Sequence, residues 1–599
     1  MISWSSSCSG RGRGAGEGVH LQRAATATTA LRSRCCPQGG APRHALGQSL
    51  RRRPDSDVCA ATTALDDAVL VARRASSAAA AATASDHTVE TTPTPGTATT
   101  TYNIVFITSE VAPWSKTGGL GDVCGSLPPA LASRGHRVLV VAPRYAAYPE
   151  ASDTGKRITV LDVEVGFFHT HIKGVDWVFV DHPSYQRVGG LYADAFGVYG
   201  DNQFRYALLS LAALEMPLQL ELNGSLYGQD CVFIANDWHA SLVPVYLAAK
   251  YRPHAVYTDA RSILAIHNLR HQGVFPPSSY AMLGLPGNWY GALEWQYPPH
   301  MRQGSYEEEG RAVNTMKAGI STADRVVTVS PGYAWEIQTP EGGWGMEEML
   351  ASRAYALNGV LNGIDGAEWS PESDPHLPRR YGRSNFSRGK AENKATLQRE
   401  LGLPERPNVP LIGFIGRLDF QKGADLVLAV VPWLMQQDVQ LVCLGTGDPG
   451  LEAGMRWMES SYPDAARGWV GFNVPMSHKI TAAADLLLMP SRFEPCGLNQ
   501  LYAMAYGTVP VAHATGGLRD TVLPFDPWKG TGTGWTSSPC TAEAFQAALG
   551  TALVTLREHP DSFRALQLRG MERDSSWDAA ARQYEQIFAW AKLDQPYAK

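Results

Sequence analysis

The sequence predicts an α/β protein with two Rossmann-like, doubly wound halves. Short apolar runs alternate with helical patterns along most of the chain, and this alternation restarts near residue 360. The runs are continuously apolar, which is typical of strands covered on both faces in a parallel sheet with crossover helices. The length of 599 residues also indicates more than one hydrophobic core.

The first half is expected to span residues 101–358. A helix is predicted from Gly119 to about Arg134, directly after the first apolar run. The predicted strands of this half cover residues 103–109, 137–143, 176–181, 231–237, 262–268 and 325–330.

The second half is expected to span residues 359–575, with the junction between the halves near residues 355–370. Its predicted strands cover residues 410–418, 440–445, 467–472, 486–491 and 509–517. In residues 576–599, apolar side chains recur at helical spacing and predict a last helix. Doubly wound sheets bind ligands at the carboxyl ends of their strands. A cleft between the two halves is therefore the expected place for a functional site.

Residues 1–100 differ in composition from the rest of the chain and are expected to lie outside the fold. Before Asp55 there are nine arginines and one acidic residue, Glu17, among Ser, Ala, Thr and Gly. This composition is typical of an organelle transit peptide and lacks the apolar stretch of a secretory signal. A Thr- and Pro-rich linker follows. A disordered regulatory tail is the alternative, and composition does not separate a mitochondrial from a chloroplast destination.

The overall composition argues against several classes of protein. The net charge of −5 does not suit a nucleic-acid-binding protein, which usually has a basic face. No stretch has the roughly 18 uninterrupted apolar residues of a transmembrane helix, so no membrane is expected as a partner. The nine cysteines are scattered and form no pattern of a disulfide framework or a zinc site.

A glycine-rich loop, KTGGLGDV, covers residues 116–123. Glycines at the start of a helix let backbone N–H groups approach an anion, and Lys116 adds a positive charge. The lysine precedes the glycines, unlike in a P-loop, and Cys124 stands where a dinucleotide fingerprint has its third glycine. The loop predicts a phosphate site, with a tight turn bearing a surface lysine as the alternative.

The motif GRLDFQKG in the second half supplies two further cations. Arg417 ends a predicted strand, and Lys422 lies at the start of the next helix. Two cations and a helix dipole suit a diphosphate whose negative charge grows as it departs. Surface cations on a loop are the alternative interpretation.

Further polar residues follow predicted strands, one of them in the second half and the others at two strand ends of the first half. Glu494 comes just before a helix, where a carboxylate can accept hydrogen bonds from sugar hydroxyls or cap the helix. Asp237 and His239 follow one strand of the first half, and His267 follows the next. Structural histidines are the alternative for this pair of strand ends.

Several catalytic motifs are absent between residues 100 and 599. There is no HExxH, no GxxxxGK[ST] and no GxSxG. The DxD carboxylate pair that holds a metal in many sugar-nucleotide enzymes is also absent. If a diphosphate leaves here, basic groups and helix ends must replace the metal, and no metal or other cofactor is expected.

Six stretches, taken together, resemble the starch and glycogen synthase family. They are SEVAPWSKTGGLGDVCGSLP, NDWH, IHN, GRLDFQKG, PSRFEPCGLNQLY and ATGGLRDTV, in the family's order between about Asn103 and Tyr597. The resemblance implies a retaining glucosyltransferase with the two-Rossmann-domain GT-B fold, whose last helix crosses back to the first domain. Among family members the chain looks most like the soluble class I of plants and green algae. This implies the plastid stroma, with some association with starch granules.

The resemblance also implies roles for individual residues. It identifies Asp237, His267, Arg417, Lys422 and Glu494 as catalytic. For ADP-glucose binding it implies Glu110, Lys116, Gly118, Gly119, Asn362, Phe472 (stacking on adenine), Cys496, Gly497, Leu498, Thr515, Gly516 and Gly517.

The implied reaction transfers glucose from ADP-glucose to the non-reducing end of an α-1,4-glucan with retention of configuration. Many retaining relatives carry a second glutamate eight residues after the first, where this chain has Tyr502. We therefore expect front-face displacement, in which the leaving diphosphate takes the acceptor's proton, with a covalent glucosyl-enzyme as the alternative. Starch-branching enzymes and other starch synthases are the implied protein partners.

Three other functions and one regulatory role stay open. A granule-bound synthase uses the same chemistry, a glucan phosphorylase shares the architecture but needs pyridoxal phosphate, and an inactive scaffold would only bind glucan. Cys124 and Cys496 lie in or beside two site motifs. A small packed residue is the favoured interpretation of both cysteines, with a redox switch as the alternative.

Overall fold

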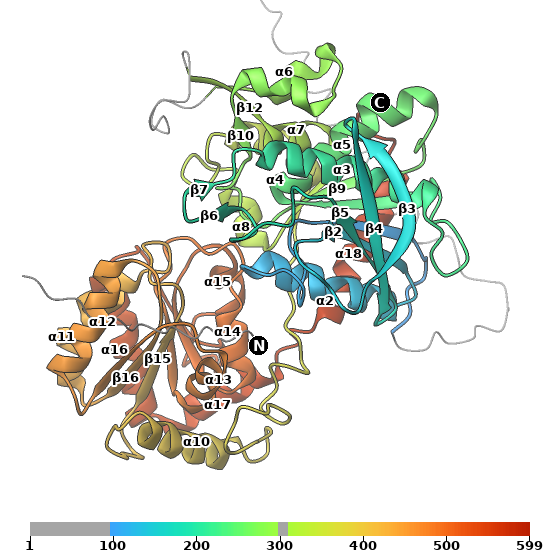
Figure 1. The fold of residues 1–599 in the computed structure, drawn as a ribbon. Helices are drawn as coiled ribbons and strands as arrows, with labels where there is room; N and C mark the ends of the chain where they lie inside the picture. Colours follow the sequence, from blue (N-terminus) through green and yellow to red (C-terminus); the bar gives the residue numbers. More distant parts are fainter. Residues whose placement is uncertain (1–95, 297–309, 599) are drawn as a thin grey trace, which may run out of the picture. The chain divides into compact units, whose positions relative to one another are not determined.

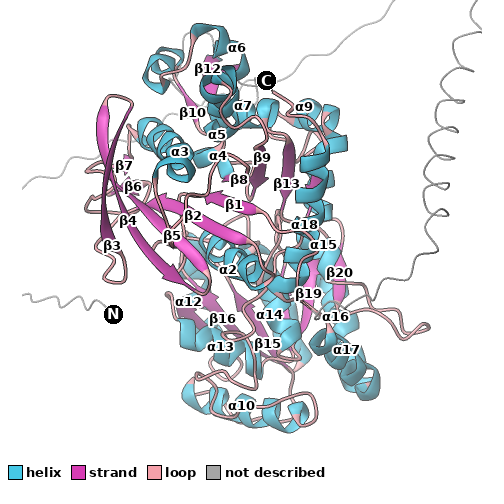
Figure 2. Ribbon diagram, turned by 90° about the vertical axis from the view of Figure 1, so that its right-hand side faces the viewer, coloured by secondary structure: helices cyan, strands magenta, loops and turns pink. Residues whose placement is uncertain are grey.

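The computed structural model describes residues 96–296 and 310–598. The predicted transit peptide and most of the linker lie outside these residues. From Thr92 onward the chain forms one compact unit, which contains two large sheets with helices on both faces (Figures 1 and 2).

The sheet of the first half has the strand order β14-β13-β9-β8-β1-β2-β5-β4-β3. The run from β14 to β5 is parallel, and β4 and β3 add an antiparallel edge. The strand bounds are β1 Asn103–Ile107, β2 Arg137–Pro143, β3 Ser152–Val160, β4 Val163–Ile172, β5 Val175–Asp181, β8 Cys231–Asn236, β9 Arg261–Ile266, β13 Arg325–Thr328 and β14 Leu357–Gly359.

The helices and smaller strands of this half connect and cover that sheet. The main helices are α2 Gly119–Ser133, α3 Asn202–Gln219, α4 Asp237–Ala240, α5 Leu242–Tyr246, α6 Tyr290–Leu293, α7 Thr315–Thr322, α8 Pro331–Glu336 and α9 Glu347–Ser352. A hairpin is formed by β6 Ala193–Asp194 and β7 Gly197–Val198, and a small antiparallel sheet by β10 Val274–Phe275, β11 Glu294–Gln296 and β12 Arg311–Asn314.

The predicted burial of both sheet faces is confirmed by the way successive strand residues pack. In β1, Ile104 and Phe106 enter the core beneath α2, whereas Val105 and Ile107 enter the core on the opposite face. An uninterrupted apolar strand can satisfy both cores at once, because neighbouring side chains point to opposite faces.

The sheet of the second half is entirely parallel, in the order β17-β16-β15-β18-β19-β20. Its strands are β15 Leu411–Ile415, β16 Gln440–Gly445, β17 Ala466–Val470, β18 Leu486–Met489, β19 Val509–His513 and β20 Trp535–Ser537. The accompanying helices are α10 Phe386–Glu400, α11 Ala424–Leu434, α12 Pro449–Ser461, α13 Val474–Ala483, α14 Asn499–Ala505, α15 Gly516–Thr521, α16 Ala542–Glu558 and α17 Pro560–Glu572.

Each sheet reverses its strand order at one point. In chain order the parallel strands run 3-2-1-4-5-6 in the second half, and the first half has the same order with one more strand. The reversals fall between β1 and β8 and between β15 and β18. Doubly wound sheets bind ligands at such switch points, which therefore locate the expected site.

The last helix, α18 Trp577–Leu593, packs on the sheet of the first half. Trp577, Tyr584 and Phe588 belong to the same core as alternate residues of β1 and β2. Arg134 at the end of α2 binds the Glu585 carboxylate through two nitrogens, at 2.6 and 2.9 Å. The helix therefore returns from the second half to the first, as the family fold implies.

The sequence-based prediction missed the antiparallel edge and the shortest strands. In β3 polar and exposed residues prevail, and only Ile158 and Val160 are buried. An edge strand covered on one face has no continuous apolar run, which was the signal used for prediction.

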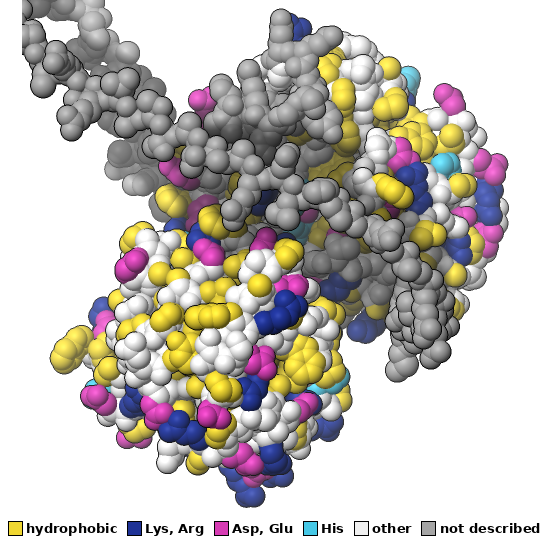
Figure 3. All heavy atoms as spheres, turned by 60° about the vertical axis from the view of Figure 1, so that its left-hand side comes forward, with side chains coloured by type: hydrophobic (Ala, Val, Ile, Leu, Met, Phe, Trp, Pro, Cys, Tyr) yellow, Lys and Arg dark blue, Asp and Glu magenta, His cyan; other side chains and the backbone are white. Residues whose placement is uncertain are grey.

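The described helices include none that is long and apolar enough to cross a membrane. On the face seen in Figure 3, Lys and Arg side chains are interspersed with Asp and Glu side chains. Interspersed charges of both signs are typical of a solvated protein surface.

Candidate active site

Glu110, which follows β1, is only 4% exposed and binds the backbone of the glycine-rich loop. Its carboxylate accepts hydrogen bonds from the backbone N–H of Thr117 (2.6 Å) and Gly118 (3.2 Å). The hydroxyl of Tyr192 donates to the same carboxylate at 2.6 Å. Because these partners fill the carboxylate, Glu110 holds the loop in position.

The glycines of the loop leave open space at the start of α2. A Cβ atom added to Gly118 or Gly119 would meet no protein atom within 4 Å, and neither residue has a positive φ. Neither packing nor backbone strain therefore requires glycine at these two positions. A ligand that comes close to the backbone would require it, because a side chain would fill the space. Lys116 is half-exposed beside them, with Nζ 2.6 Å from Asp122 Oδ1, so a cation stands at a helix N-terminus.

The two cations of GRLDFQKG follow β15 and already have carboxylate partners. Arg417 Nη1 lies 2.9 Å from Asp419 Oδ2, and its side chain is 66% exposed. Lys422 Nζ lies 2.5 Å from Glu494 Oε2, which joins the ends of β15 and β18. Gly423 has φ +70°, and a Cβ there would lie 2.2 Å from the Pro490 carbonyl oxygen. Only glycine fits this turn, which aims Lys422 at Glu494.

The segment around Glu494 packs directly against the glycines that follow β19. A Cβ on Gly516 would lie 2.1 Å from the Glu494 carbonyl oxygen, and one on Gly517 2.2 Å from that of Cys496. The Gly517 N–H also donates to the Glu494 carbonyl at 3.0 Å. The structure thus brings residues 494–496 and 515–517 together, as predicted for two parts of one site. Gly497 (φ +72°) and Leu498 continue this turn to the start of α14.

Asp237 follows β8 with a left-handed backbone, φ +53°. Its Oδ1 accepts hydrogen bonds from the backbone N–H of His267 (2.7 Å) and Asn268 (3.3 Å), which ties the end of β8 to that of β9. Burial raises the pKa of this carboxyl group to about 7, against the two backbone donors, which lower it. A charged Asp237 would therefore be stabilised by a cationic centre placed beside it.

His267 is neutral, because burial lowers its pKa to about 4. Its Nε2 lies 3.0 Å from Asn236 Oδ1, and the Asn236 amide nitrogen donates to the Ile107 and Ile234 carbonyls. The Asn236 oxygen must then accept, so His267 carries its proton on Nε2 and keeps a lone pair on Nδ1. A hydroxyl group can donate to that lone pair.

His239 does not join Asp237 and His267. Its ring lies 4.9 Å from that of Tyr192 and 4.7 Å from that of Tyr206, and burial lowers its pKa well below the usual value. It is a packed aromatic group, which was the alternative interpretation.

Phe472 lies apart from the other predicted residues in the second sheet. It follows β17, two strands away from β15, and its side chain is 89% exposed. Asn362 lies in the segment between the halves. Its backbone forms a hydrogen bond to the thiol of the buried Cys496, and this bond lowers the thiol pKa.

Cys124 and Cys496, near the site, are buried and form no disulfide. Burial is the largest influence on each thiol and raises the pKa of Cys124 and of Cys496 to about 12. Thiols of this kind are unreactive at neutral pH, which agrees with a packing role.

Ser330, which caps the start of α8, and Glu336, at its end, reach the second half and were missed by the sequence analysis. The Ser330 hydroxyl donates to the Pro495 carbonyl at 2.7 Å. Glu336 accepts hydrogen bonds from the Gly516 N–H (2.8 Å) and the Thr515 hydroxyl (3.1 Å). Neither residue follows a strand directly with a recognisable motif, so no local signal identified them. Asn236 was not singled out either. It is the first residue of NDWH, at the end of a predicted strand, so the sequence did offer a local signal for it.

Within residues 96–296 and 310–598, no group of three His, Cys, Asp or Glu side chains is placed to hold a metal ion. The expectation that no metal or other cofactor takes part stays a prediction.

Comparison with known proteins identifies the family. A model described as the starch synthase catalytic domain matches residues 103–352, and one described as glycosyl transferases group 1 matches residues 394–564. Both matched regions contain residues of the site described above.

Two curated relatives and one solved structure cover most of the chain. Starch synthase 1 of Triticum aestivum is 60% identical over 513 residues, which are 84% of this chain and 79% of the relative. Granule-bound starch synthase 2 of Solanum tuberosum is 50% identical over 517 residues, 84% of this chain and 65% of the relative. The catalytic domain of starch synthase IV from Arabidopsis thaliana, solved with ADP and acarbose, is 31% identical with a TM-score of 0.71; the match covers 83% of this chain and all of that one.

The wheat relative is named as chloroplastic and amyloplastic, which supports a plastid location for this chain. The GT-B fold expected from the sequence is confirmed by the likeness to the starch synthase IV domain. The chain therefore belongs to the starch synthase family and is a glycosyltransferase with starch synthase activity in starch biosynthesis.

Proposed function

We propose that this chain transfers glucose from ADP-glucose to the non-reducing end of an α-1,4-glucan, with retention of the α configuration. The observation that carries the proposal is the position of Lys116 at the switch point of the first sheet and of the Lys422–Glu494 pair at the switch point of the second. The starch synthase IV domain was solved with ADP and acarbose, which supports a nucleoside diphosphate and a glucan-like ligand here.

The diphosphate would bind where the cations and the open backbone of α2 lie. Arg417 and Lys422 hold its negative charge, and Lys116 with Gly118 and Gly119 approaches it from the first half. Both lysines now pair with carboxylates, Asp122 and Glu494, and would exchange these partners for phosphate oxygens. Cations aimed at a charge that grows in the transition state contribute more to catalysis than to ground-state binding.

The remaining predicted residues would complete the donor site. Glu494, released from Lys422, accepts hydrogen bonds from glucose hydroxyls, and the turn at Cys496, Gly497 and Leu498 lies alongside. We propose that the backbone of residues 515–517 faces the diphosphate and that Phe472 stacks on adenine. Asn362 and Glu110 position the surrounding segments.

The transfer is proposed to proceed on one face of the glucose ring. The bond from C1 to the phosphate oxygen breaks while the acceptor's O4 bonds to C1 from the same side, and the departing phosphate takes the O4 proton. Asp237 stabilises the positive charge at C1, and Nδ1 of neutral His267 accepts a hydrogen bond from a glucose hydroxyl. Tyr502, at the place of a second glutamate, stacks on Trp369 at 3.7 Å, and burial raises its pKa, so it supplies no base.

The domain division, location and partners belong to the same proposal. A boundary near residue 359 is supported by the end of β14 at Gly359, and the last boundary by the start of α18 at Trp577. The N-terminal composition supports the plastid stroma, with granule association as a further expectation. Starch-branching enzymes and other starch synthases are proposed partners on the family resemblance.

Donor competition tests the proposal. Purified protein is given ADP-glucose and UDP-glucose together, with maltoheptaose or glycogen as acceptor, and release of each nucleotide is measured. We expect ADP release that depends on the glucan and greatly exceeds UDP release. Glucan binding without any ADP release would instead support an inactive scaffold. A glucosyl adduct trapped on Asp237 or Glu494 with a slow-leaving donor would overturn the one-face mechanism.

A further inference from the structure

Arg205, in the first turn of α3, is a fully buried cation. Its guanidinium donates to two oxygens, the Leu191 carbonyl and the side-chain amide of Asn202, and among the described residues no carboxylate pairs with it. The Nε and Nη2 atoms have no hydrogen-bond partner in the same part of the chain. Burial of an unpaired charge costs free energy, so stability alone does not account for this arginine.

Tyrosine rings surround the guanidinium in place of a carboxylate. Burial raises the pKa of the Tyr206 hydroxyl, the charge of Arg205 lowers it, and the charge of Glu110 raises it further. Both charges therefore lie within electrostatic reach of one ring. Cation–π contacts of this kind offset part of the cost of burying the cation. The Arg205 Cζ lies 5.2–5.8 Å from the ring centroids of Tyr145, Tyr185, Tyr199 and Tyr206.

Arg205 and Asn202 together hold two successive backbone carbonyl groups. Arg205 Nη1 donates to the Leu191 carbonyl at 3.0 Å and to Asn202 Oδ1 at 2.6 Å. Asn202 Nδ2 in turn donates to the Tyr192 carbonyl at 3.0 Å. Because the arginine can only donate, it fixes the Asn202 amide with its oxygen toward Arg205 and its nitrogen toward Tyr192. The first turn of α3 thus fixes the backbone at Tyr192.

Tyr192 connects this turn to the glycine-rich loop. Its hydroxyl donates to Glu110 Oε1 at 2.6 Å. The other oxygen of that carboxylate accepts hydrogen bonds from the backbone N–H groups of Thr117 and Gly118, at 2.6 and 3.2 Å. A continuous series of hydrogen bonds therefore runs from Arg205 to the loop, and it joins segments that are far apart in the sequence.

We propose that Arg205 and Asn202 are positioning residues, which hold the glycine-rich loop in the arrangement that binds its ligand. They act on the loop through Tyr192 and Glu110. The consequence for ADP-glucose rests on the proposed function, which places the donor's diphosphate at this loop. The hold on the loop itself does not depend on that function.

Asn202→Asp separates positioning from stability. Aspartate keeps an oxygen that accepts from Arg205 and adds a charge that pairs with it, but it cannot donate to the Tyr192 carbonyl. The free energy of unfolding should therefore equal or exceed that of the wild type. Amide hydrogens of Thr117 and Gly118 should exchange with solvent about tenfold faster, and the KM for ADP-glucose should rise about tenfold. A merely structural role predicts wild-type exchange and a wild-type KM.

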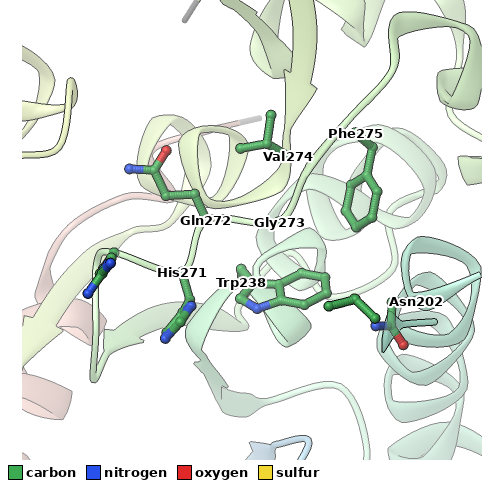
Figure 4. Close-up of a pocket in the computed structure, with 9 residues that line it drawn as sticks. Asn202, Trp238, His271, Gln272, Gly273, Val274 and Phe275 are labelled. Carbon is green, nitrogen blue, oxygen red and sulfur yellow. The ribbon is translucent and has the colours of Figure 1, made fainter. Parts of the chain in front are cut away.

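Arg205 supplies a second, independent variant. Asn202 also lines a cavity of about 310 Å³, together with Trp238 (Figure 4), whereas Arg205 does not line it. Arg205→Met removes the charge and both hydrogen bonds, and it should raise the exchange rate and the KM as Asn202→Asp does. Arg205→Lys retains a charge and a donor and should restore most of the wild-type values.

Arg187→Ala is the matched control. Arg187 lies over the same Tyr199 ring, with Cζ 4.9 Å from the centroid. Within the described part of the chain its only hydrogen-bond partner is Asp201, just before α3. Its removal should leave the exchange of the loop and the KM for ADP-glucose unchanged.

A double variant tests whether the effect passes through Tyr192. Tyr192→Phe removes the hydroxyl that binds Glu110. In that background Asn202→Asp should raise the KM for ADP-glucose by less than about twofold, because the series is already broken, whereas independent effects would multiply. Multiplication would overturn the proposed route.

The proposal and the proposed function fail in different ways. Wild-type exchange of the loop in both Asn202→Asp and Arg205→Met would overturn the positioning role, whatever the KM. Faster exchange with an unchanged KM for ADP-glucose would support positioning and contradict the assignment of the loop to the donor. If the wild type releases no ADP with any glucan, the proposed function is wrong and the exchange rates alone decide. If Arg205→Met unfolds, Asn202→Asp decides, because it keeps the buried arginine paired.

Discussion

At the scale of single residues, Asp237 carries a strained backbone and a carboxyl group that burial keeps close to protonation at neutral pH. A non-glycine residue with positive φ costs free energy, and such strain persists where the surrounding structure holds it. Here the two backbone donors of residues 267 and 268 hold the side chain. Strain and a perturbed pKa in one residue are typical of a functional position.

Asp237→Asn should flatten the dependence of stability on pH. The native pKa, about 7, lies above the unfolded value of about 3.9, so the native state binds a proton that the unfolded state has released. The contribution of this proton to the free energy of unfolding is complete below about pH 4 and is lost as pH rises through 7. Denaturant unfolding at pH 5, 6, 7 and 8 should show a steeper fall for the wild type than for the variant. Equal slopes would mean that the carboxyl group ionises normally.

Glucosyl transfer by the Asp237→Asn variant should fall about 100-fold or more.

The two lysines should respond differently to replacement by alanine. Lys116→Ala should raise the KM for ADP-glucose far more than it weakens glucan binding, with little loss of stability, because its ion pair is half-exposed. Lys422→Ala should also lower the free energy of unfolding, by about 1–3 kcal/mol, because Glu494 loses its charged partner and stays buried. Steady-state kinetics and thermal unfolding distinguish the two effects. An equal loss of donor use and glucan binding in Lys116→Ala would contradict the assignment of the glycine-rich loop.

At the scale of elements, α18 and the pair α8 and α15 connect the two halves. Arg134 joins α2 to α18 through Glu585 and Asp578, and its side chain is only 7% exposed. Glu336 joins α8 to the turn before α15. The Arg134 contacts hold α18 on the first half, and the Glu336 contacts hold the turn before α15 against it.

Arg134→Ala should lower the free energy of unfolding by about 3 kcal/mol, because the Glu585 carboxylate, 18% exposed, loses two charge-assisted hydrogen bonds. Arg582→Ala, on α18 itself, is the matched control. Arg582 pairs with Asp578, but its side chain is 51% exposed, so the expected loss is below about 1 kcal/mol. Chemical unfolding measures both losses, and similar values would mean that α18 is not anchored through Arg134.

Glu336→Ala should raise the KM for ADP-glucose several-fold, because the turn at Thr515 and Gly516 loses the acceptor that orients it. Glu336→Gln keeps an acceptor oxygen and should retain most of the wild-type KM. Initial rates over a range of donor concentrations compare the two. An unchanged KM in Glu336→Ala would show that this contact has only a structural role.

Prediction from sequence succeeded where the signal was local. The apolar runs of β1, β2, β8 and β9, and in the second sheet those of β15, β16, β18 and β19, were identified because burial on both faces leaves a continuous pattern. Helix α2 was predicted within one residue, since glycines precede it and its apolar residues recur at helical spacing. The polar residues after these strands could be singled out for the same reason, and their roles stay predictions.

What the sequence did not predict depends on contacts between distant segments. Glu336 meets Thr515 across 179 residues, and Arg134 meets Glu585 across 451. The partners of Glu110 required the loop to be folded, and the partly exposed β3 had no continuous apolar run. The role of His239 was open in the sequence because a histidine at a strand end can be either a catalytic or a packed side chain.

At the scale of the whole molecule, two sheets with the same strand order place their switch points at the glycine-rich loop and at GRLDFQKG. Lys116 and Asp237 flank the first reversal, and Lys422 and Glu494 flank the second. Duplicated topology thus supplies two ligand-binding edges, one of which we assign to the acceptor and the other to most of the donor.

The most direct test of the central claim follows the label from donor to product. Purified chain is incubated with ADP-glucose labelled in its glucose and with maltoheptaose, and the product is digested with an exo-acting α-1,4-glucanase that begins at the non-reducing end. Our account predicts that ADP is released in the same amount as glucosyl units are added to the glucan, and that the first digestion step releases label. Release of ADP with free labelled glucose, or label that resists the enzyme, would contradict α-1,4 transfer to the non-reducing end.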